Sequence, residues 1–193
     1  MAILTKFCRR MLSCVMACAV PGAVVAADYQ IDPSHAFVQF RILHLGYSLL
    51  PGRFNTLRGN FQWDKAHPEL SRIEVTIDTA SIDTIWAERD KHLRSANFLS
   101  VDEFPTAKFI STGYTGDASG GTLEGKLSLH GVTRAITLQA KVIGEGRDPW
   151  GGYRAGFFAT TTIKRSDFRV NKFELGPASD PMKFELMIEG IRQ

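Results

Sequence analysis

Cysteine is nearly absent from this 193-residue sequence, and its three copies, Cys8, Cys14 and Cys18, all lie near the N-terminus. If that N-terminal segment is removed, the remaining chain has no thiol, which excludes disulfides, thiolate metal sites and cysteine nucleophiles. The chain also lacks a Gly-x-Ser-x-Gly elbow, a His-Glu-x-x-His pair and a Gly-rich phosphate loop. The common motifs of serine hydrolases, zinc peptidases and nucleotide-binding proteins are therefore missing.

The first 27 residues have the layout of a secretory signal peptide. Three basic residues between positions 6 and 10 precede an uncharged apolar run from Met11 to Ala27, and that run ends in small residues. This order of charged, apolar and small residues is typical of a leader that is cleaved on export. We predict cleavage after Ala27 or one residue earlier, which leaves residues 28–193 as a single domain in the periplasm.

Three other interpretations of the leader are weaker. The apolar run is short for an uncleaved membrane anchor, and Pro21 interrupts it. Arg9 and Arg10 resemble a twin-arginine export signal, but the residues after them fit that signal poorly. Residues 15–18 resemble a lipoprotein box only loosely. Export by the Sec route with cleavage is therefore the prediction.

The leader carries all of the excess positive charge. The full sequence has 23 Lys and Arg against 20 Asp and Glu, and three of the basic residues but none of the acidic ones lie in the leader. The mature chain is therefore balanced at a formal net charge of zero. It has no electrostatic reason to bind nucleic acid or an anionic bilayer. We expect no nucleic-acid partner, and no stable membrane insertion once the leader is cleaved.

Short segments rich in Val, Ile, Thr and Phe alternate with turn residues through the mature chain, which is typical of strands. In one segment Ile73, Val75 and Ile77 share a face while polar residues share the other, so the strand has a dry face and a wet face. Residues 87–95 lack alternation, Gly and Pro, and predict one short helix. The pattern predicts eight strands, over residues 36–45, 53–64, 71–83, 106–116, 121–130, 132–144, 152–164 and 182–191.

Eight antiparallel strands predict an all-β fold that closes into an up-and-down barrel, because closure removes exposed strand edges. A two-sheet sandwich with a solid core is the rival, and alternation alone does not separate the two. The 19 aromatic residues within residues 28–193 favour a barrel with room for one small ligand. An outer-membrane barrel is disfavoured by the helical tract, by the absence of long loops and by a C-terminus that does not end on an aromatic residue.

The polar residues do not predict a specific catalytic or metal centre. The five histidines are scattered, and no pair has the i,i+2 or i,i+4 spacing that presents two ligands to one metal. Glu88, Asp90 and His92 form the densest polar cluster and could supply a general base, although any solvated helix face has such neighbours. We expect no metal, no cofactor and no enzymatic activity, and keep an enzyme acting on a small apolar substrate as the alternative. Residues 148–154 form a turn, which is either structural or part of a ligand entrance.

The inward-facing apolar residues are either a solid core or the wall of an open tube. If they form a tube, its ligand must be apolar, because polar groups buried without partners are costly. The predicted ligand-binding residues are Val38, Phe40, Ile42, Leu57, Phe61, Trp63, Val75, Ile77, Trp86, Phe98, Phe109, Leu127, Leu129, Ile136, Leu138, Phe157, Phe184, Leu186 and Ile188.

Six motifs in this order and spacing resemble the YceI-like family of secreted lipid-binding proteins, over essentially all of residues 28–193. The matching motifs are Tyr-Gln-Ile-Asp-Pro-Ser-His at 29–35, His-Leu-Gly-Tyr at 44–47, the tract 87–95 followed by Phe98 and Leu99, Leu-His-Gly-Val-Thr-Arg at 129–134, residues 148–157, and Ser-Asp-Phe at 166–168.

The resemblance implies a lipocalin-like antiparallel barrel with a polyisoprenoid chain, such as an isoprenoid quinone or its precursor, inside it, and no catalytic residues. We therefore predict a periplasmic carrier of a long isoprenoid lipid, with the lipid headgroup near the helix or near the turn 148–154. An interaction module with a solid core remains a third hypothesis. A homodimer is also an expectation, because a lipid shuttle could bury its mouth against a second copy.

Overall fold

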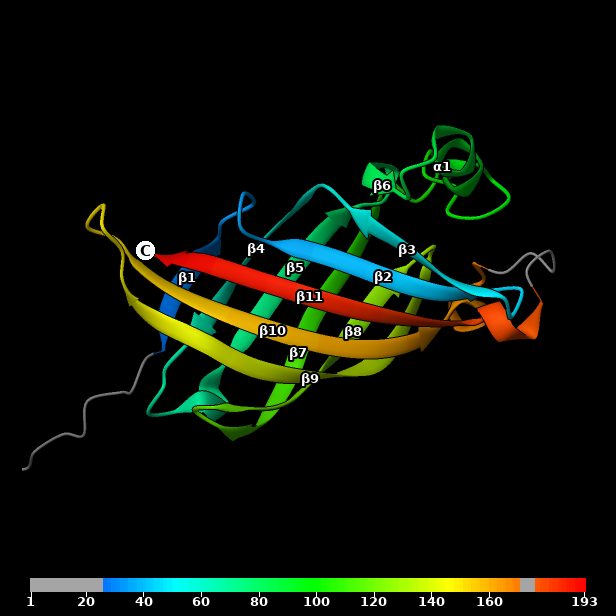
Figure 1. The fold of residues 1–193 in the computed structure, drawn as a ribbon. Coiled ribbons are helices and arrows are strands. Elements are labelled where there is room, and N and C mark those ends of the chain that lie inside the picture. Colours follow the sequence, from blue (N-terminus) through cyan, green and yellow to red (C-terminus); the bar gives the residue numbers. More distant parts are fainter. Residues whose placement is uncertain (1–25, 171–175) are drawn as a thin grey trace, which may run out of the picture.

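The structure is a computed structural model that describes residues 26–170 and 176–193 (Figure 1). Nearly all of the predicted leader therefore lies outside the described residues. The described part consists of strands with one α-helix, α1 (Ala87–Arg94). The strands are β1 (Ala27–Ile31), β2 (Phe37–His44), β3 (Ser48–Phe54), β4 (Leu57–Trp63), β5 (Arg72–Asp78), β6 (Ile82–Asp83), β7 (Thr106–Asp117), β8 (Gly120–Leu129), β9 (Val132–Arg147), β10 (Tyr153–Lys164) and β11 (Pro181–Arg192).

The strands form a closed antiparallel barrel. Their order is β1-β4-β5-β7-β8-β9-β10-β11-β2-β3-β6, and a pairing between β1 and β11 closes the sheet. β11 pairs with β1 near its C-terminal end and with β2 along the rest of its length. β1 and β2 are therefore two parts of one interrupted barrel strand, and the same holds for β3 with β4 and for β5 with β6. The predicted eight-stranded up-and-down barrel is confirmed.

Two strands were not predicted, and two predicted strands are interrupted. β1 and β3 are absent from the prediction; the predicted strand 53–64 spans the end of β3 and all of β4, and the predicted strand 71–83 is split into β5 and β6. β3 contains Pro51 and Gly52, which usually indicate a turn. Beyond its last two residues β3 has only β2 as a neighbour, so Pro51 lies on a sheet edge, where a missing N–H is tolerated.

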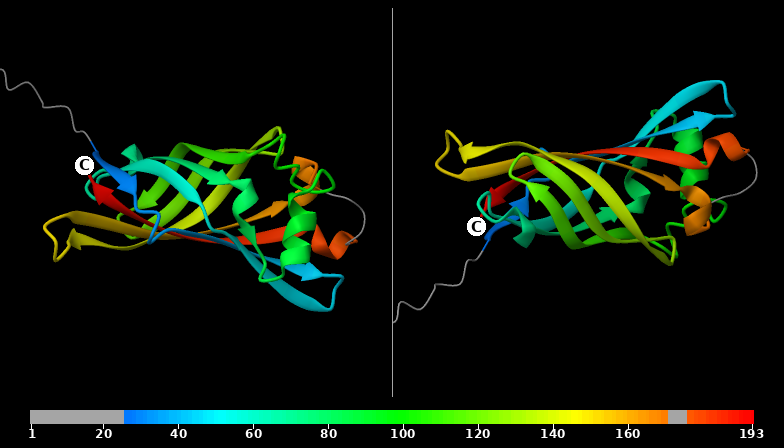
Figure 2. Two further views of the ribbon diagram at one scale, coloured as in Figure 1. Left: turned by 90° about the horizontal axis from the view of Figure 1, so that it is seen from above. Right: turned by 90° about the horizontal axis from the view of Figure 1, so that it is seen from below.

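Helix α1 lies across one end of the barrel, away from the C-terminus (Figure 2). It begins and ends within one residue of the predicted tract. Arg94 donates hydrogen bonds from Nε to the Ala80 carbonyl at 2.7 Å and from Nη2 to the Ile82 carbonyl at 2.6 Å. The helix is therefore fixed to the segment around β6 by contacts outside the helix itself. Among the described residues, no helix has both the length and the apolar composition to cross a bilayer.

The core is formed by inward-facing side chains in rows along the strands. One buried cluster lies toward β1 and the C-terminus and includes Tyr29, Phe61 and Trp63. A second lies toward α1 and includes Phe40 and Phe168. Glycine makes space for some of the inward rings: a Cβ at Gly125 on β8 would lie 2.3 Å from Cζ of Phe109, so only glycine fits there without displacing the ring.

Candidate functional site

The barrel encloses a cavity of about 420 Å³, within the range of roughly 300–1,000 Å³ typical of small-molecule sites. Its wall is almost entirely apolar and comes from both ends and the middle of the barrel. The structure thus has a cavity where a solid-core sandwich would have none. The predicted residues that line it are Val38, Phe40, Ile42, Phe61, Trp63, Val75, Ile77, Phe98, Phe109, Leu127, Leu129, Ile136, Leu138, Phe157, Phe184, Leu186 and Ile188.

Leu57 and Trp86 were also predicted to contact the ligand, but neither lines the cavity. Leu57 is buried in the cluster toward β1, where it packs as core. Trp86 precedes α1 and is 64% exposed, because the chain turns outward there to enter the helix. The role of the other predicted residues as ligand contacts stays a prediction, although their position on the wall is now established.

Sequence reasoning placed no polar residue on the cavity wall, and of those that line it only His92 was singled out, as a possible general base. The charged or titratable residues on the wall are His44, Arg72, Arg89, His92, Tyr114 and Arg165. Period-two alternation could have found Arg165, because it continues the inward-facing row of Phe157, Ala159, Thr161 and Ile163 along β10. A pattern of apolar residues alone ends at Ile163, so it does not include this position.

Aromatic packing fills the barrel toward β1. The Phe61 ring stacks on Tyr29 with ring centroids 4.8 Å apart, and Phe157 meets both Phe61 and Trp63 edge-on at 5.3 and 5.2 Å. The Trp63 indole also donates from Nε1 to Glu145 Oε2 at 2.7 Å, which fixes its ring. Phe61, Trp63 and Phe157 thus form an aromatic floor at this end of the cavity.

Outside that floor, Arg154 is surrounded by carboxylates. Its Nη1 donates to Asp32 Oδ2 at 2.8 Å and to Glu189 Oε1 at 2.6 Å, and its Nε donates to Asp148 Oδ2 at 3.0 Å. Hydrogen bonds from Ser34 and from Arg154 hold the pKa of Asp32 well below its usual range, and the three carboxylates raise the pKa of Arg154. The predicted turn 148–154 is thus held mainly as a structural element.

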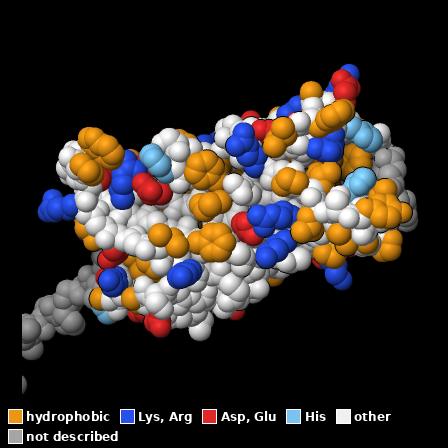
Figure 3. Space-filling model, in the orientation of Figure 1, with side chains coloured by type: hydrophobic (Ala, Val, Ile, Leu, Met, Phe, Trp, Pro, Cys, Tyr) orange, Lys and Arg blue, Asp and Glu red, His pale blue; other side chains and the backbone are white. Residues whose placement is uncertain are grey.

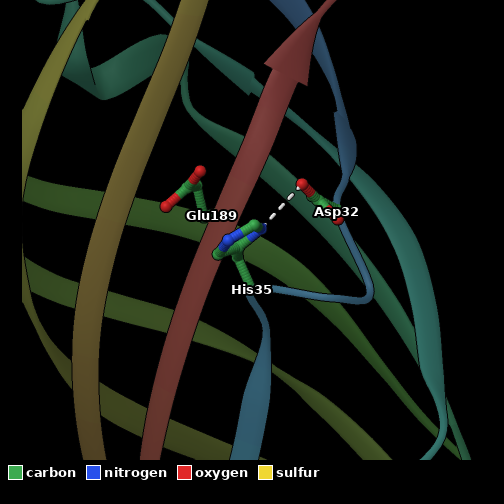
Figure 4. Close-up of side chains that lie close together, drawn as sticks. All are labelled: Asp32, His35 and Glu189. Atoms are coloured by element: carbon green, nitrogen blue, oxygen red, sulfur yellow. Dashed lines mark hydrogen bonds and ion pairs between the residues drawn. The ribbon is translucent and has the colours of Figure 1, made fainter. Parts of the chain in front are cut away.

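The fold also brings Asp32 and His35, from the segment between β1 and β2, together with Glu189 of β11 (Figure 4). Their ligand atoms lie within 4.8 Å of one another, as in a metal site. However, the oxygens that face inward already accept hydrogen bonds from Arg154, and His35 Nδ1 lies 3.0 Å from the same Asp32 oxygen. The guanidinium is the cation of this cluster, so the residues do not fit a metal ion.

At the opposite end of the cavity, Arg165 follows β10 in the short 3₁₀ helix η3 (Arg165–Phe168). The residue is only 4% exposed. Its Nε donates to the backbone carbonyl of Ser179 at 2.8 Å, while its buried Nη2 has no hydrogen-bond partner among the described residues. Burial lowers the pKa of Arg165, and the nearby Asp180 opposes that shift.

The cluster considered for catalysis does not converge in the structure. Glu88 and His92 are exposed, and the His92 ring packs edge-on against Phe98 at 4.9 Å. The buried Asp90 carboxylate accepts hydrogen bonds from the backbone N–H of Thr84, at 2.9 Å, and from the Thr84 hydroxyl. Asp90 therefore ties α1 to Thr84, which precedes the helix, and is engaged there rather than with Glu88 or His92.

Exposed apolar side chains gather at the end of the molecule that carries α1 and the β2–β3 turn (Figure 3). Tyr47 and Leu49 in that hairpin are 87% and 67% exposed, and Ile85 before α1 is 88% exposed. The opposite end has Trp150, whose ring lies 5.9 Å from the Arg154 guanidinium carbon. The two ends thus differ on the surface as well as inside.

Comparison with known proteins gives one family. The sequence profile described as the YceI-like domain matches residues 29–190. A UPF0312 protein of Pseudomonas aeruginosa is 52% identical over 174 residues, which cover 89% of this chain and 91% of that relative.

Two solved structures show the same barrel. A YCEI protein of Campylobacter jejuni superimposes with a TM-score of 0.69 at 28% identity, covering 76% of this chain and 86% of that one. A polyisoprenoid binding domain from Saccharophagus degradans, implicated in plant cell wall breakdown, superimposes with a TM-score of 0.66 at 18% identity. It covers 88% of this chain and all of the other, and at that identity the likeness shows the fold alone.

Proposed function

The chain belongs to the YceI-like family, and from that premise we propose that it binds a long polyisoprenoid lipid inside its barrel and carries it without transforming it. A family fold with an internal apolar cavity supports lipid binding, and the Saccharophagus degradans neighbour is described as a polyisoprenoid binding domain. Our proposal adds two points: the lipid is a polyisoprenoid, and the protein carries it rather than acting on it as an enzyme.

The observation that carries the proposal is the enclosed apolar wall around about 420 Å³ of space. Burying a lipid chain there gains about 0.8 kcal/mol for each methylene, so roughly a dozen buried carbons supply on the order of 10 kcal/mol before the cost of association. Binding by burial requires no catalytic group. Of the three residues considered for catalysis, only His92 lines the cavity, because the Asp90 carboxylate is bonded to Thr84 and Glu88 is exposed.

Native mass spectrometry of freshly purified protein tests the proposal. We expect a bound species that dissociates as a prenyl lipid and appears again in a solvent extract. A protein that carries no lipid, and that takes up no octaprenyl compound after mixing, would contradict lipid binding.

A matched pair of variants ties the binding to the cavity. Ala159 on β10 is buried and lines the cavity, so Ala159→Trp should fill it and abolish lipid loading without adding a charge. Ala135 on β9 is exposed, so Ala135→Trp adds the same side chain outside the barrel and should leave loading unchanged. Both variants should be checked for a cooperative thermal transition. If a folded Ala159→Trp protein carried as much lipid as wild type, the lipid would have to bind outside the cavity.

Export to the periplasm is part of the same proposal. The leader-like order of residues 1–27 supports it, and Ala27, the last residue before the predicted cut, is paired with Trp63 at the start of β1. Fractionation of expressing cells, followed by N-terminal sequencing, should place the mature chain in the periplasm with Ala27 or Asp28 first. Uncleaved protein in the cytoplasm would contradict this. The homodimer stays a prediction, and the mass of the native complex measures it directly.

A further inference from the structure

The inward row of β10 ends on a charged residue. Phe157, Ala159, Thr161 and Ile163 all line the cavity, and Arg165 occupies the next inward position. Its side chain is therefore directed inward by the same alternation that directs the apolar residues. An arginine in this position is unusual, because charged side chains are rarely buried without a counter-charge.

Among residues 26–170 and 176–193, the hydrogen-bond partner of the Arg165 side chain is neutral. Nε binds the carbonyl of Ser179, and Nη2 is buried without a partner there. Asp180, whose charge acts on Arg165, uses its two carboxylate oxygens to accept hydrogen bonds from the backbone N–H and hydroxyl of Ser166, each at 2.8 Å. A buried guanidinium nitrogen without an acceptor costs free energy that the folded chain does not recover.

The other two arginines on the wall differ from Arg165. Arg89 donates to the Thr84 hydroxyl and carbonyl, and Arg72 donates to the Ser71 carbonyl at 2.7 Å. Both are less buried than Arg165. No aspartate or glutamate among the described residues lines the cavity, so its wall has positive charge and no negative charge.

Arg165 is also held rigidly. The Ser179 residue that accepts its hydrogen bond is fully buried, accepts a hydrogen bond from the backbone N–H of Leu45, and donates to the Leu43 carbonyl. The anchor of Arg165 is thus tied to the end of β2, on either side of His44, which itself lines the cavity. A guanidinium fixed in this way loses little conformational freedom when it binds a ligand.

We propose that Arg165 binds an anionic oxygen headgroup, a carboxylate or a phosphate, on the lipid in the cavity, with the lipid chain extending toward the aromatic floor. The planar guanidinium is matched to these groups because it donates parallel hydrogen bonds to two oxygens. This inference rests on the proposed function and sharpens it. It places the headgroup at the α1 end of the barrel and excludes the turn 148–154, where Arg154 is already neutralised.

Three probes with the same C20 prenyl chain test the inference: geranylgeraniol, geranylgeranoic acid and geranylgeranyl monophosphate. Delipidated wild-type protein should bind at least one anionic probe roughly tenfold or more tightly than the neutral alcohol, since a hydrogen bond to a charged group is stronger than one to a neutral group. Whether the acid or the phosphate binds more tightly identifies the headgroup source. Equal binding of all three would mean that Nη2 is satisfied in another way, and would overturn the inference.

Variants assign the preference to Arg165. Arg165→Met should remove the preference for anionic probes while geranylgeraniol still binds, and Arg165→Lys should keep part of it because the charge remains without the planar fork. Lys164→Met removes one positive charge from the neighbouring exposed position and should keep the full preference. An Arg165→Met or Arg165→Lys protein with undiminished preference would overturn the assignment.

The two proposals fail in different ways. If wild-type protein binds none of the three probes and carries no lipid after purification, the proposed function fails, and this inference fails with it. If geranylgeraniol binds inside the barrel, so that Ala159→Trp abolishes its binding, and no anionic probe binds more tightly, only the headgroup inference fails. Recovery of a neutral prenyl quinone as the bound lipid would likewise overturn the headgroup inference and leave the proposed function standing.

Discussion

Arg154 lies near the start of β10 and Arg165 directly follows its end, and the two arginines have opposite surroundings. Arg154 contacts three carboxylates, from Asp32, Asp148 and Glu189. Arg165 is more buried and contacts one backbone carbonyl. The first arginine completes an ionic cluster that the chain provides by itself. The second has unused hydrogen-bonding capacity that faces a cavity, so it is suited to a ligand.

The same difference separates the two barrel ends as a whole. At the end near Arg154, stacked and edge-on aromatic rings pack against one another. The end near Arg165 combines titratable wall residues with exposed apolar side chains on the β2–β3 hairpin. The two ends therefore differ in what their charged residues contact, and variants at each end test that difference separately.

Removing the Arg154 cation should have the largest effect on stability. Arg154→Met leaves Asp32, Asp148 and Glu189 close together without a counter-charge, and we expect the melting temperature at neutral pH to fall by roughly 5–10 °C. Differential scanning calorimetry measures the change. Arg154→Lys is the control and should lose less, because one positive charge remains. An unchanged melting temperature in Arg154→Met would show that the cluster is not a structural clamp.

Removing the Arg165 cation should change the melting temperature of the delipidated protein in the opposite direction. Arg165→Met replaces a poorly partnered buried charge by an apolar side chain, and the lost hydrogen bond to Ser179 offsets only part of the gain. We expect delipidated Arg165→Met to melt roughly 2–4 °C above delipidated wild type. The order should reverse when both are loaded with an anionic prenyl lipid. A lower melting temperature for the delipidated variant would make Arg165 a structural residue like Arg154.

Acid should weaken the cluster of Asp32, Asp148, Glu189 and Arg154. The pKa of Asp32 is lowered in the folded protein, so its contribution to stability is fully present above its unfolded pKa of about 4 and is lost as the pH falls below that value. We expect the wild-type melting temperature to decrease between about pH 5 and pH 2.5, and Asp32→Asn to show a shallower decrease. Thermal melts across this pH range provide the test. If the melting temperatures of the two proteins fell in parallel, Asp32 would not be the cause of the loss of stability in acid.

The smallest effect should come from Trp150, which contacts Arg154 through its ring alone. The Trp150 side chain is 82% exposed, and its ring centroid lies 5.9 Å from the guanidinium carbon. Exposed cation–π contacts are weak, so Trp150→Ala should lower the melting temperature by roughly 1–3 °C and leave lipid loading unchanged. A loss comparable to that of Arg154→Met would mean that the ring, and not the carboxylates, stabilises the guanidinium.

Much of the fold followed from local patterns. The eight barrel strands and the helix at 87–95 were predicted because alternation and helix propensity depend on neighbouring residues only. The interruptions were missed because they depend on distant partners. After β3, for example, the backbone N–H of Asn55 binds the Ser81 carbonyl and the N–H of Thr56 binds the Ser81 hydroxyl. No local feature of residues 53–64 reveals that contact.

The candidate site divides in the same way. The sequence by itself determined that residues such as Val38, Phe109 and Leu186 face inward, because period two fixes the face of each strand residue. Only the tertiary structure decided what each arginine of β10 meets. Asp32 lies 122 residues from Arg154 in the chain, and barrel closure through β1 and β11 brings the two together. Among the described residues, no acid forms an ion pair with Arg165, and Asp180 is bonded to Ser166 instead. The partners of a charge are set by long-range strand register, which local sequence patterns do not contain.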